Sequence, residues 1–212
     1  MMTAEDAEKV RAAVAKAEAG LTAEIVPCVY AQSSPYPEAL WAGCGAGMGL
    51  AVVALLLLDL SHPLWVPLSR LILWVPAGGL LGAALGRWCG PVRRALIGGR
   101  RMEDAVARRA KEVFFDRGIA RTAGRDGVLI FASLLERRVV VLADDAVRAK
   151  VGPAAWDEAV AAMTALAAEG RVADGLCAAV EKTAAAMSAV GFSGAPSFGN
   201  ELGDDPLTGD GH

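Results

Sequence analysis

The run of residues 39–58, ALWAGCGAGMGLAVVALLLL, contains 20 residues without a charge. As a helix it would be about 30 Å long, which matches the hydrocarbon core of a bilayer. Such a helix is apolar on every face, so it needs lipid or a large protein core around it. The alternative is a buried core helix, but a chain of 212 residues offers little room for one. The run therefore predicts a membrane-spanning helix.

A second apolar segment follows at residues 64–86, LWVPLSRLILWVPAGGLLGAALG. Arg70 lies near its start, where a long side chain can reach the membrane interface. Pro76 is tolerated where neighbouring groups satisfy the freed carbonyls. The short stretch 59–63 between the segments would force an antiparallel hairpin. A re-entrant or interfacial helix is the alternative for the second segment, but together the two predict a transmembrane helical hairpin over residues 39–88.

Glycines recur at helical spacing in both apolar segments. The first segment has Gly43/Gly47 and Gly45/Gly49, and the second has Gly78, Gly82 and Gly86. Small residues let helix backbones approach closely in lipid, where no hydrophobic drive brings helices together. The stripes either pack the hairpin on itself or join it to a second copy. The expected partners are therefore the lipid bilayer and, through these faces, another membrane protein or a second copy.

Arginines gather directly after the second apolar segment. They are Arg87, Arg93, Arg94, Arg100, Arg101, Arg108 and Arg109. The stretch 59–63 has no lysine or arginine, so the positive-inside rule places both large flanks and both termini in the cytoplasm. The net charge is only −3 and no aromatic residues interleave with the basic run, so no nucleic-acid partner is expected.

Outside the hairpin, helix-like and strand-like patterns alternate. Helices are predicted at residues 4–19, 102–117, 154–169 and 172–190, and strands at residues 24–32, 128–133 and 138–143. A strand–helix–strand crossover favours a parallel pair, and the short connection to the last strand returns it antiparallel. The predicted fold class is α/β: a small mixed β-sheet flanked by helices, an α/β/α sandwich, interrupted by the transmembrane hairpin.

Neither soluble piece has enough strands to fold alone. We therefore expect residues 1–38 and 89–190 to form one domain, with the hairpin at residues 39–88 inserted between them. From Gly191 onward the chain is rich in Gly, Ser, Pro and Asp, which predicts a flexible tail over residues 191–212. The four cysteines form no CxxC pair, so neither a disulfide framework nor a zinc site is indicated.

Short motifs in the predicted domain resemble the TPM domain family, which includes a thylakoid acid phosphatase and a photosystem II repair factor. In chain order they are Thr22-Ala23-Glu24-Ile25, Ser33, Ser34, Tyr36, Phe114, Thr122, Asp126-Gly127-Val128-Leu129-Ile130, Glu136-Arg137, Ala143-Asp144, Trp156 and Asn200-Glu201-Leu202. The last of these resembles the tail of the bacterial membrane-bound branch. The resemblance implies an α/β/α sandwich in a bacterial inner membrane protein. Family members are described as acid phosphatases, calcium binders, or assembly and repair factors.

The predicted topology brings four carboxylates to one edge of the sheet, where the starts of the first and second strands meet the end of the third. They are Glu24, Asp126, Asp144 and Asp145. Clustered carboxylates repel one another unless a cation lies among them, and oxygen ligands suit Ca²⁺ or Mg²⁺. The alternative is that they are turn-formers and helix caps. Ca²⁺ or Mg²⁺ is thus the candidate cofactor, and no other is indicated.

The opposite edge of the sheet, on the side where the hairpin begins, would gather a second polar set. It comprises Ser33, Ser34, Tyr36, Ser133, Glu136, Arg137 and Arg138. Paired guanidinium groups such as Arg137 and Arg138 can hold a phosphate or a lipid headgroup. The alternative is an ordinary polar hairpin turn.

No residue set predicts a familiar hydrolase, and no catalytic residue is assigned. The only histidines are His62, in the turn of the apolar hairpin, and His212, at the C-terminus. This excludes Ser–His or Cys–His catalysis inside the domain. Three functions stay open: a non-catalytic membrane-anchored binding, assembly, stress or repair module; a divalent-metal-dependent acid phosphatase; and a structural membrane protein with a cytoplasmic cap. The missing nucleophile–base pair favours the first.

Overall fold

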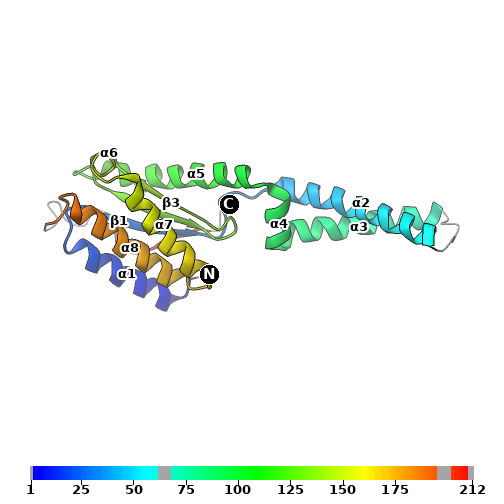
Figure 1. Ribbon diagram of the computed structural model, residues 1–212, viewed down its shortest axis with the longest axis horizontal. Helices are drawn as coiled ribbons and strands as arrows, with labels where there is room; N and C mark the ends of the chain where they lie inside the picture. Colours follow the sequence, from blue (N-terminus) through cyan, green and yellow to red (C-terminus); the bar gives the residue numbers. More distant parts are fainter. Residues whose placement is uncertain (1, 62–67, 195–201, 210–212) are drawn as a thin grey trace. The chain divides into compact units, whose positions relative to one another are not determined.

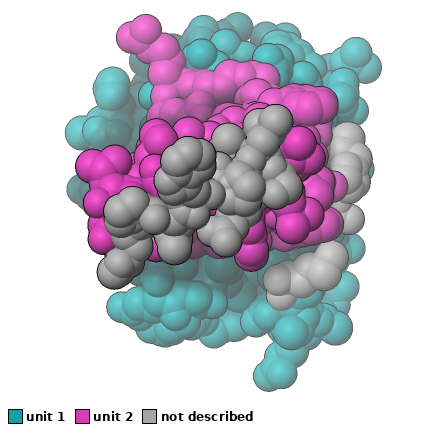
Figure 2. Space-filling view, turned by 90° about the vertical axis from the view of Figure 1, so that its right-hand side faces the viewer, with its two compact units in different colours: residues 1–34, 103–212 teal, residues 35–102 magenta. Residues whose placement is uncertain are grey.

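The computed structural model describes residues 2–61, 68–194 and 202–209. They divide into two compact units, drawn in two colours in Figure 2. The α/β unit comprises residues 1–34 and 103–212, and the helical unit comprises residues 35–102. The N-terminal residues and the long C-terminal segment therefore share one compact unit, on either side of the apolar hairpin in the sequence.

A four-stranded mixed sheet forms the centre of the α/β unit. Its strands are β1 (Ile25–Tyr30), β2 (Val128–Ser133), β3 (Arg138–Ala143) and β4 (Leu207–Gly209), in the order β3-β2-β1-β4. β1 pairs in parallel with β2 and with β4, whereas β2 and β3 are antiparallel. The prediction of a mixed sheet with a parallel first pair and an antiparallel return is confirmed.

Helices cover both faces of this sheet. They are α1 (Ala4–Glu18), α5 (Gly99–Asp116), α6 (Asp145–Arg148), α7 (Pro153–Ala168) and α8 (Val172–Ala189), with a 3₁₀ turn, η1 (Ile119–Arg121), between α5 and β2. Figure 1 shows α1, α7 and α8 on one face and α5 on the other. The predicted arrangement of a sheet between helices is thus confirmed.

Alternation along the strands divides the core into two layers. Ile25, Val128 and Ile130 pack with α1, α7 and α8. Val26, Leu129 and Phe131 point the other way and pack with α5. Successive strand residues face opposite sides of a sheet, so a sheet covered on both faces needs continuous apolar strands. All six residues of β2 are buried, which is why VLIFAS contains no charge.

α5 is amphipathic, as its sequence predicts. The predicted apolar face, Met102, Val106, Ala110, Val113 and Phe114, is buried. The other faces of the helix carry arginines, lysine and acidic residues. The spacing of three to four residues places the apolar side chains on one stripe, which covers the sheet.

The helical unit contains α2 (Pro37–Ser61), α3 (Leu68–Trp88) and α4 (Gly90–Ile97). Among the described helices, α2 alone is long and apolar enough to cross a membrane by itself, with a mean hydropathy of 2.0 over its best window. Ile72–Trp88 passes the same test only together with Gly90–Ile97, and the two are bent by 96°. The structure therefore supports one candidate span, or two if the bent pair is one span, and does not establish the predicted two-span hairpin.

Glycines bring α2 and α3 together at backbone distance. Gly43 and Gly47 of α2 lie against Gly82 and Gly78 of α3. The other stripe of α2 points away, because a Cβ added at Gly49 would meet nothing within 4 Å. The Gly43/Gly47 stripe is thus used inside the hairpin itself.

The C-terminal segment, predicted to be a flexible tail, contributes a strand. Leu207–Gly209 forms β4 and pairs with Cys28–Tyr30 of β1. A strand of three residues has too little periodicity to be recognised in a sequence, and only the exposed edge of β1 gives it a partner. Residues His62, Pro63, Asn200 and Glu201, used in the hairpin prediction and the family resemblance, lie outside the described residues, as does the side chain of Arg70.

Candidate functional site

A buried hydrogen-bond network lies at the carboxyl ends of β1 and β2. The backbone N–H of Ser33 donates to Glu136 Oε1 at 2.8 Å. The Ser33 hydroxyl donates to Ser133 Oγ at 2.8 Å, and Ser133 Oγ donates to Glu136 Oε2 at 2.5 Å. Each of these three residues is at least 95% buried. The network holds the chain after β1 against the β2–β3 turn.

Tyr36, expected at the same edge, belongs instead to the helical unit. The guanidinium carbons of Arg93 and Arg101 lie 5.7 Å and 5.9 Å from the centre of its ring. The Arg93 side chain also donates to the carbonyl oxygen of Pro35 at 2.5 Å. Cations over an aromatic face are attracted by the ring quadrupole, so these contacts hold Tyr36 beside Arg93 of α4 and Arg101, both within the helical unit.

Arg137 and Arg138, the predicted phosphate or headgroup residues, line a cavity of about 500 Å³. Arg137 ends the β2–β3 turn with φ +52°, and its side chain is exposed. Arg138 begins β3, and its Nη2 lies 3.7 Å from Glu103 Oε2. Both arginines therefore contribute to the lining of one opening between β3 and α7, but the Arg138 guanidinium reaches toward α5, on the other face of the sheet. The remaining lining residues are Ala132, Ser133, Leu134, Val139, Met163, Thr164, Ala167, Ala168 and Val172.

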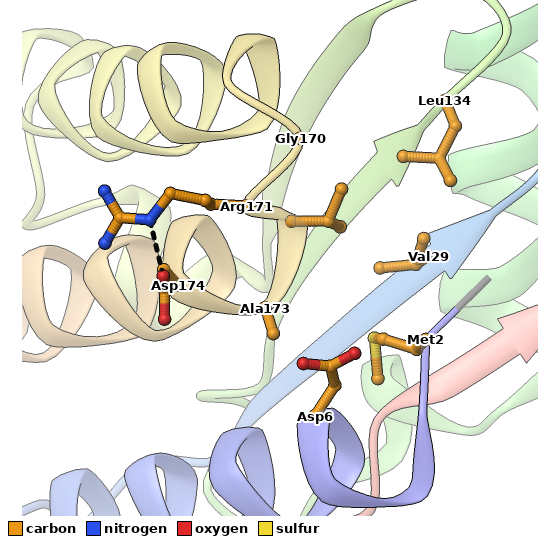
Figure 3. Close-up of a pocket in the computed structure, with 9 residues that line it drawn as sticks. Met2, Asp6, Val29, Leu134, Gly170, Arg171, Ala173 and Asp174 are labelled. Atoms are coloured by element: carbon orange, nitrogen blue, oxygen red, sulfur yellow. Dashed lines mark hydrogen bonds and ion pairs between the residues drawn. The ribbon is translucent and has the colours of Figure 1, made fainter.

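A second cavity, of about 320 Å³, shares Leu134 and Val172 with the first. Figure 3 shows Met2, Val29 and Leu134, which come from different segments, around this space. Each of its charged lining residues has a partner: Asp6 accepts the Thr3 backbone N–H and hydroxyl, and Arg171 and Asp174 pair with each other. Arg171 Nε donates to Asp174 Oδ2 at 2.8 Å, and Lys9 forms an ion pair with the same carboxylate. Sequence reasoning missed this set, because nothing in the sequence links Lys9 to Asp174.

The four predicted metal ligands all lie at the opposite edge of the sheet. The backbone N–H of Val128 donates to the carbonyl oxygen of Glu24 at 2.8 Å, and that of Asp144 donates to Gly127 at 2.9 Å. Asp126 is buried and Asp145 begins α6. The predicted strand topology is the reason that these backbones meet.

Their side chains, however, are engaged by other groups. Arg125 Nε lies 3.1 Å from Asp144 Oδ2, and Arg125 Nη2 lies 3.2 Å from Asp145 Oδ2. Asp144 caps α6 by accepting the backbone N–H of Asp145 at 2.7 Å. The Thr122 hydroxyl donates to Asp126 at 3.3 Å.

These contacts bear on the predicted Ca²⁺ or Mg²⁺ site. Within residues 2–61, 68–194 and 202–209, no three His, Cys, Asp or Glu side chains are grouped so that they could hold a metal ion. The guanidinium of Arg125 supplies positive charge to two of the four carboxylates. The geometry therefore favours the alternative of caps and ion pairs, and the metal site stays a prediction.

Glu18, at the end of α1, is an acidic group that sequence reasoning missed. Its carboxylate accepts the backbone N–H of Ile25 at 2.7 Å. The pKa of Glu18 is raised to about 7, chiefly by burial; the hydrogen bond from Ile25 lowers it, and the neighbouring carboxylates of Asp204 and Glu24 raise it. Glu18 and Asp204 are far apart in the sequence, so only the docked C-terminal segment brings them together.

Cys28, which is buried, and Cys177, which is partly buried, offer no activated nucleophile. Burial raises the pKa of Cys28 to about 12, and it also raises the pKa of Cys177. A thiol with a raised pKa stays protonated at neutral pH, and the thiolate is the reactive form. Neither Cys28 nor Cys177 is therefore a candidate for covalent catalysis.

Comparison with known proteins gives one family model and one similar structure. Residues 97–186, which run from the end of α4 to most of α8, match the family model of the TPM domain. The NMR structure of the BA42 protein from the psychrophilic bacterium Bizionia argentinensis is similar in fold, with a TM-score of 0.57. The two share 16% sequence identity over 99% of this chain and 96% of BA42, a likeness that shows the fold alone. No curated protein matches the sequence.

Proposed function

Because this chain contains a domain of the TPM family, we propose that it is a membrane-anchored binding module, held at a lipid bilayer by α2 and α3. The observation that carries the proposal is the exposure of α2. Only 6% of its most apolar window is buried. Leu50, Leu57 and Leu60 are 71%, 62% and 81% exposed. Each exposed leucine forgoes roughly 1.5–3 kcal/mol of burial free energy in water, and a bilayer supplies the missing apolar surroundings.

α3 supports a second pass. Ile72, Leu73 and Leu80 are 67%, 67% and 74% exposed. Trp41 near the start of α2 and Trp88 at the end of α3 are also exposed, at 73% and 79%. Tryptophan concentrates at the boundary between lipid and water. In this proposal the two rings mark one membrane surface, and α4, bent by 96° from α3, lies along it.

The arginines suggest which side that surface faces. Arg87, Arg100 and Arg101 are exposed close to the Trp41 and Trp88 end of the hairpin. Positive residues stay on the cytoplasmic side. We therefore place both termini in the cytoplasm of a bacterial inner membrane, with the α/β unit on that side.

Membrane attachment is tested with the full chain expressed in bacteria. The protein should stay in the membrane pellet after alkaline carbonate extraction, whereas a peripheral protein is released. Fusions of a fluorescent protein and of periplasmic alkaline phosphatase, made at either end, report the side of each terminus. Both ends should report cytoplasm. Release of the protein by carbonate would contradict the membrane anchor. Termini on opposite sides of the membrane would show that the chain crosses it only once.

A metal-dependent acid phosphatase is the second candidate, favoured by the backbones of Glu24 and Asp144, which bond to Val128 and Gly127 directly after Asp126 in the sequence. The ion pairs of Arg125 with two of the acidic residues support the binding module instead. Purified protein is assayed for phosphate-ester hydrolysis with Mg²⁺ or Ca²⁺, beside an Asp126→Asn variant. We expect no metal-dependent turnover. Turnover that the variant loses, or thermal stabilisation by millimolar Ca²⁺, would favour the phosphatase.

A further inference from the structure

The 500 Å³ cavity between β3 and α7 combines an apolar lining with two arginines. Val139 of β3 faces Met163 and Ala167 of α7 across it. Arg137 and Arg138 are the only charged residues among the described residues that line it. The volume lies in the range of small-molecule sites, roughly 300–1,000 Å³, which are mostly apolar with a few placed polar groups.

Arg137 has a backbone conformation that residues other than glycine and asparagine rarely adopt. Its φ of +52° lies in the left-handed region, where glycine or asparagine is usual at the end of a hairpin turn. Its side chain makes no ion pair or hydrogen bond with another residue within 2–61, 68–194 or 202–209. Arg125 has the same φ of +52°, but its side chain is paired with Asp144 and Asp145. Arg137 thus presents a guanidinium beside the cavity without a described counter-ion.

The neighbouring cavity in Figure 3 shows the contrasting case. There Arg171 is paired with both Glu169 and Asp174, and Lys9 with Asp174. Charges that cancel inside the protein leave little attraction for an outside anion. The cavity between β3 and α7 differs, because Arg137 has no ion-pair partner among residues 2–61, 68–194 and 202–209, whereas Arg138 pairs with Glu103 of α5 at 3.7 Å.

We propose that the cavity between β3 and α7 binds a single-chain amphiphile with an anionic head. The apolar chain lies against Val139, Met163 and Ala167, and the carboxylate or phosphate head pairs with Arg137. A guanidinium makes charge-assisted hydrogen bonds to either head. The proposal deepens the binding function proposed above, because a bilayer anchor keeps such ligands at high local concentration, but the cavity and its charge do not depend on the anchor.

The test uses the full chain in lipid nanodiscs, with methyl-labelled methionine as the probe. Met163 lines the cavity, whereas Met48 lies in α2 and reports partition into the bilayer. The Met163 signal is assigned with Met163→Leu. Decanoate, decyl phosphate and uncharged decanol are titrated in turn. We expect both anions, but not decanol at the same concentrations, to shift Met163. Octanoate, two methylenes shorter than decanoate, should bind about 16-fold more weakly, at about fourfold for each methylene.

Two matched variants separate binding from folding. Arg137→Gly removes the guanidinium and relieves the positive φ, so the protein should melt no lower than the wild type while decanoate binds at least tenfold more weakly. Arg125→Gly makes the same change at the same φ on the opposite edge of the sheet, and it should leave decanoate binding unaltered.

Three results would overturn the inference: equal binding of decanol and decanoate, unchanged binding in Arg137→Gly, or a Met163 signal that ignores all three compounds. A peptide with an apolar C-terminus that shifts Met163 where the amphiphiles do not would assign the cavity to a protein partner instead. The proposed membrane anchor and the proposed cavity ligand can fail separately. If carbonate releases the protein but the amphiphiles still shift the Met163 signal, the anchor is wrong and the ligand assignment stands.

Discussion

Gly78 of α3 lies against the backbone of Gly47 of α2: a Cβ added at Gly78 would lie 2.7 Å from the Gly47 carbonyl oxygen. No real Cβ tolerates that approach, so neither position has room for a side chain. Gly43 and Gly82 meet in the same way one turn along. The two helices of the hairpin therefore pack backbone against backbone, through glycines, which have no side chain.

Replacing Gly47 by valine should separate the two helices. The added methyl groups would overlap the backbone of α3, and overpacking of this kind costs about 1–3 kcal/mol. Thermal unfolding of α2 and α3 in detergent, followed by circular dichroism, measures the loss. Gly49→Val is the matched control, since a Cβ there meets nothing within 4 Å. Equal loss in both variants would contradict the packing.

A disulfide should form across the hairpin when Gly79 is replaced by cysteine. A Cβ added at Gly79 would lie 3.3 Å from the Sγ of Cys44, and only the flexible Met48 side chain stands nearer. Disulfides need their Cβ atoms within about 4.5 Å. Oxidation in membranes followed by protease digestion and mass spectrometry detects the cross-link. Gly45→Cys faces open space and should give none within the chain; a cross-link there instead would show a different hairpin register.

Loss of the Glu136 carboxylate should destabilise the α/β unit strongly. Glu136→Ala would leave the buried N–H of Ser33 and hydroxyl of Ser133 without their acceptor. Hydrogen bonds to charged groups contribute about 1.5–3 kcal/mol each, and unsatisfied buried donors add to the loss. Chemical denaturation should show a decrease of about 3 kcal/mol. Glu169→Ala, at an exposed ion pair, should cost under about 1 kcal/mol. Similar values for both would disprove the network's role.

Stability should fall as the pH rises toward neutrality because of Glu18. The folded-state pKa of about 7 lies above the ordinary value of 4.5, so the folded protein binds more protons between these values. The stabilising contribution of the protonated form is complete below about pH 4.5 and is lost by about pH 7. The loss should be about 2 kcal/mol after solvent screening is allowed for.

Glu18→Gln should abolish this pH dependence, since the amide stays neutral. The melting temperature of the wild type and the variant, measured from pH 5 to pH 8, tests this. Glu8→Gln, on an exposed part of the same helix, is the control and should follow the wild type. A variant whose melting temperature still falls in parallel with the wild type would assign the pH dependence to another group.

Patterns within one element could be read from the sequence because they depend on near neighbours. The uncharged run of α2 and the apolar face of α5 repeat on the period of a helix. The strand order β3-β2-β1 followed from the length of the connections, since a short link returns antiparallel and a long one crosses over. The same topology correctly gathered Ser33, Ser133 and Glu136 at one end of the sheet.

The tertiary structure decided what those groups do. Arg125 pairs with Asp144 and Asp145, and Asp204 approaches Glu18, only because the folded chain places distant residues side by side. The cavity between β3 and α7 likewise exists only because α7 lies over β3. Sequence by itself determined which segments are apolar, helical or extended, because those properties are local. The fold alone determined which charges are neutralised and which, like that of Arg137, have no ion-pair partner among the described residues, because pairing depends on distance in space.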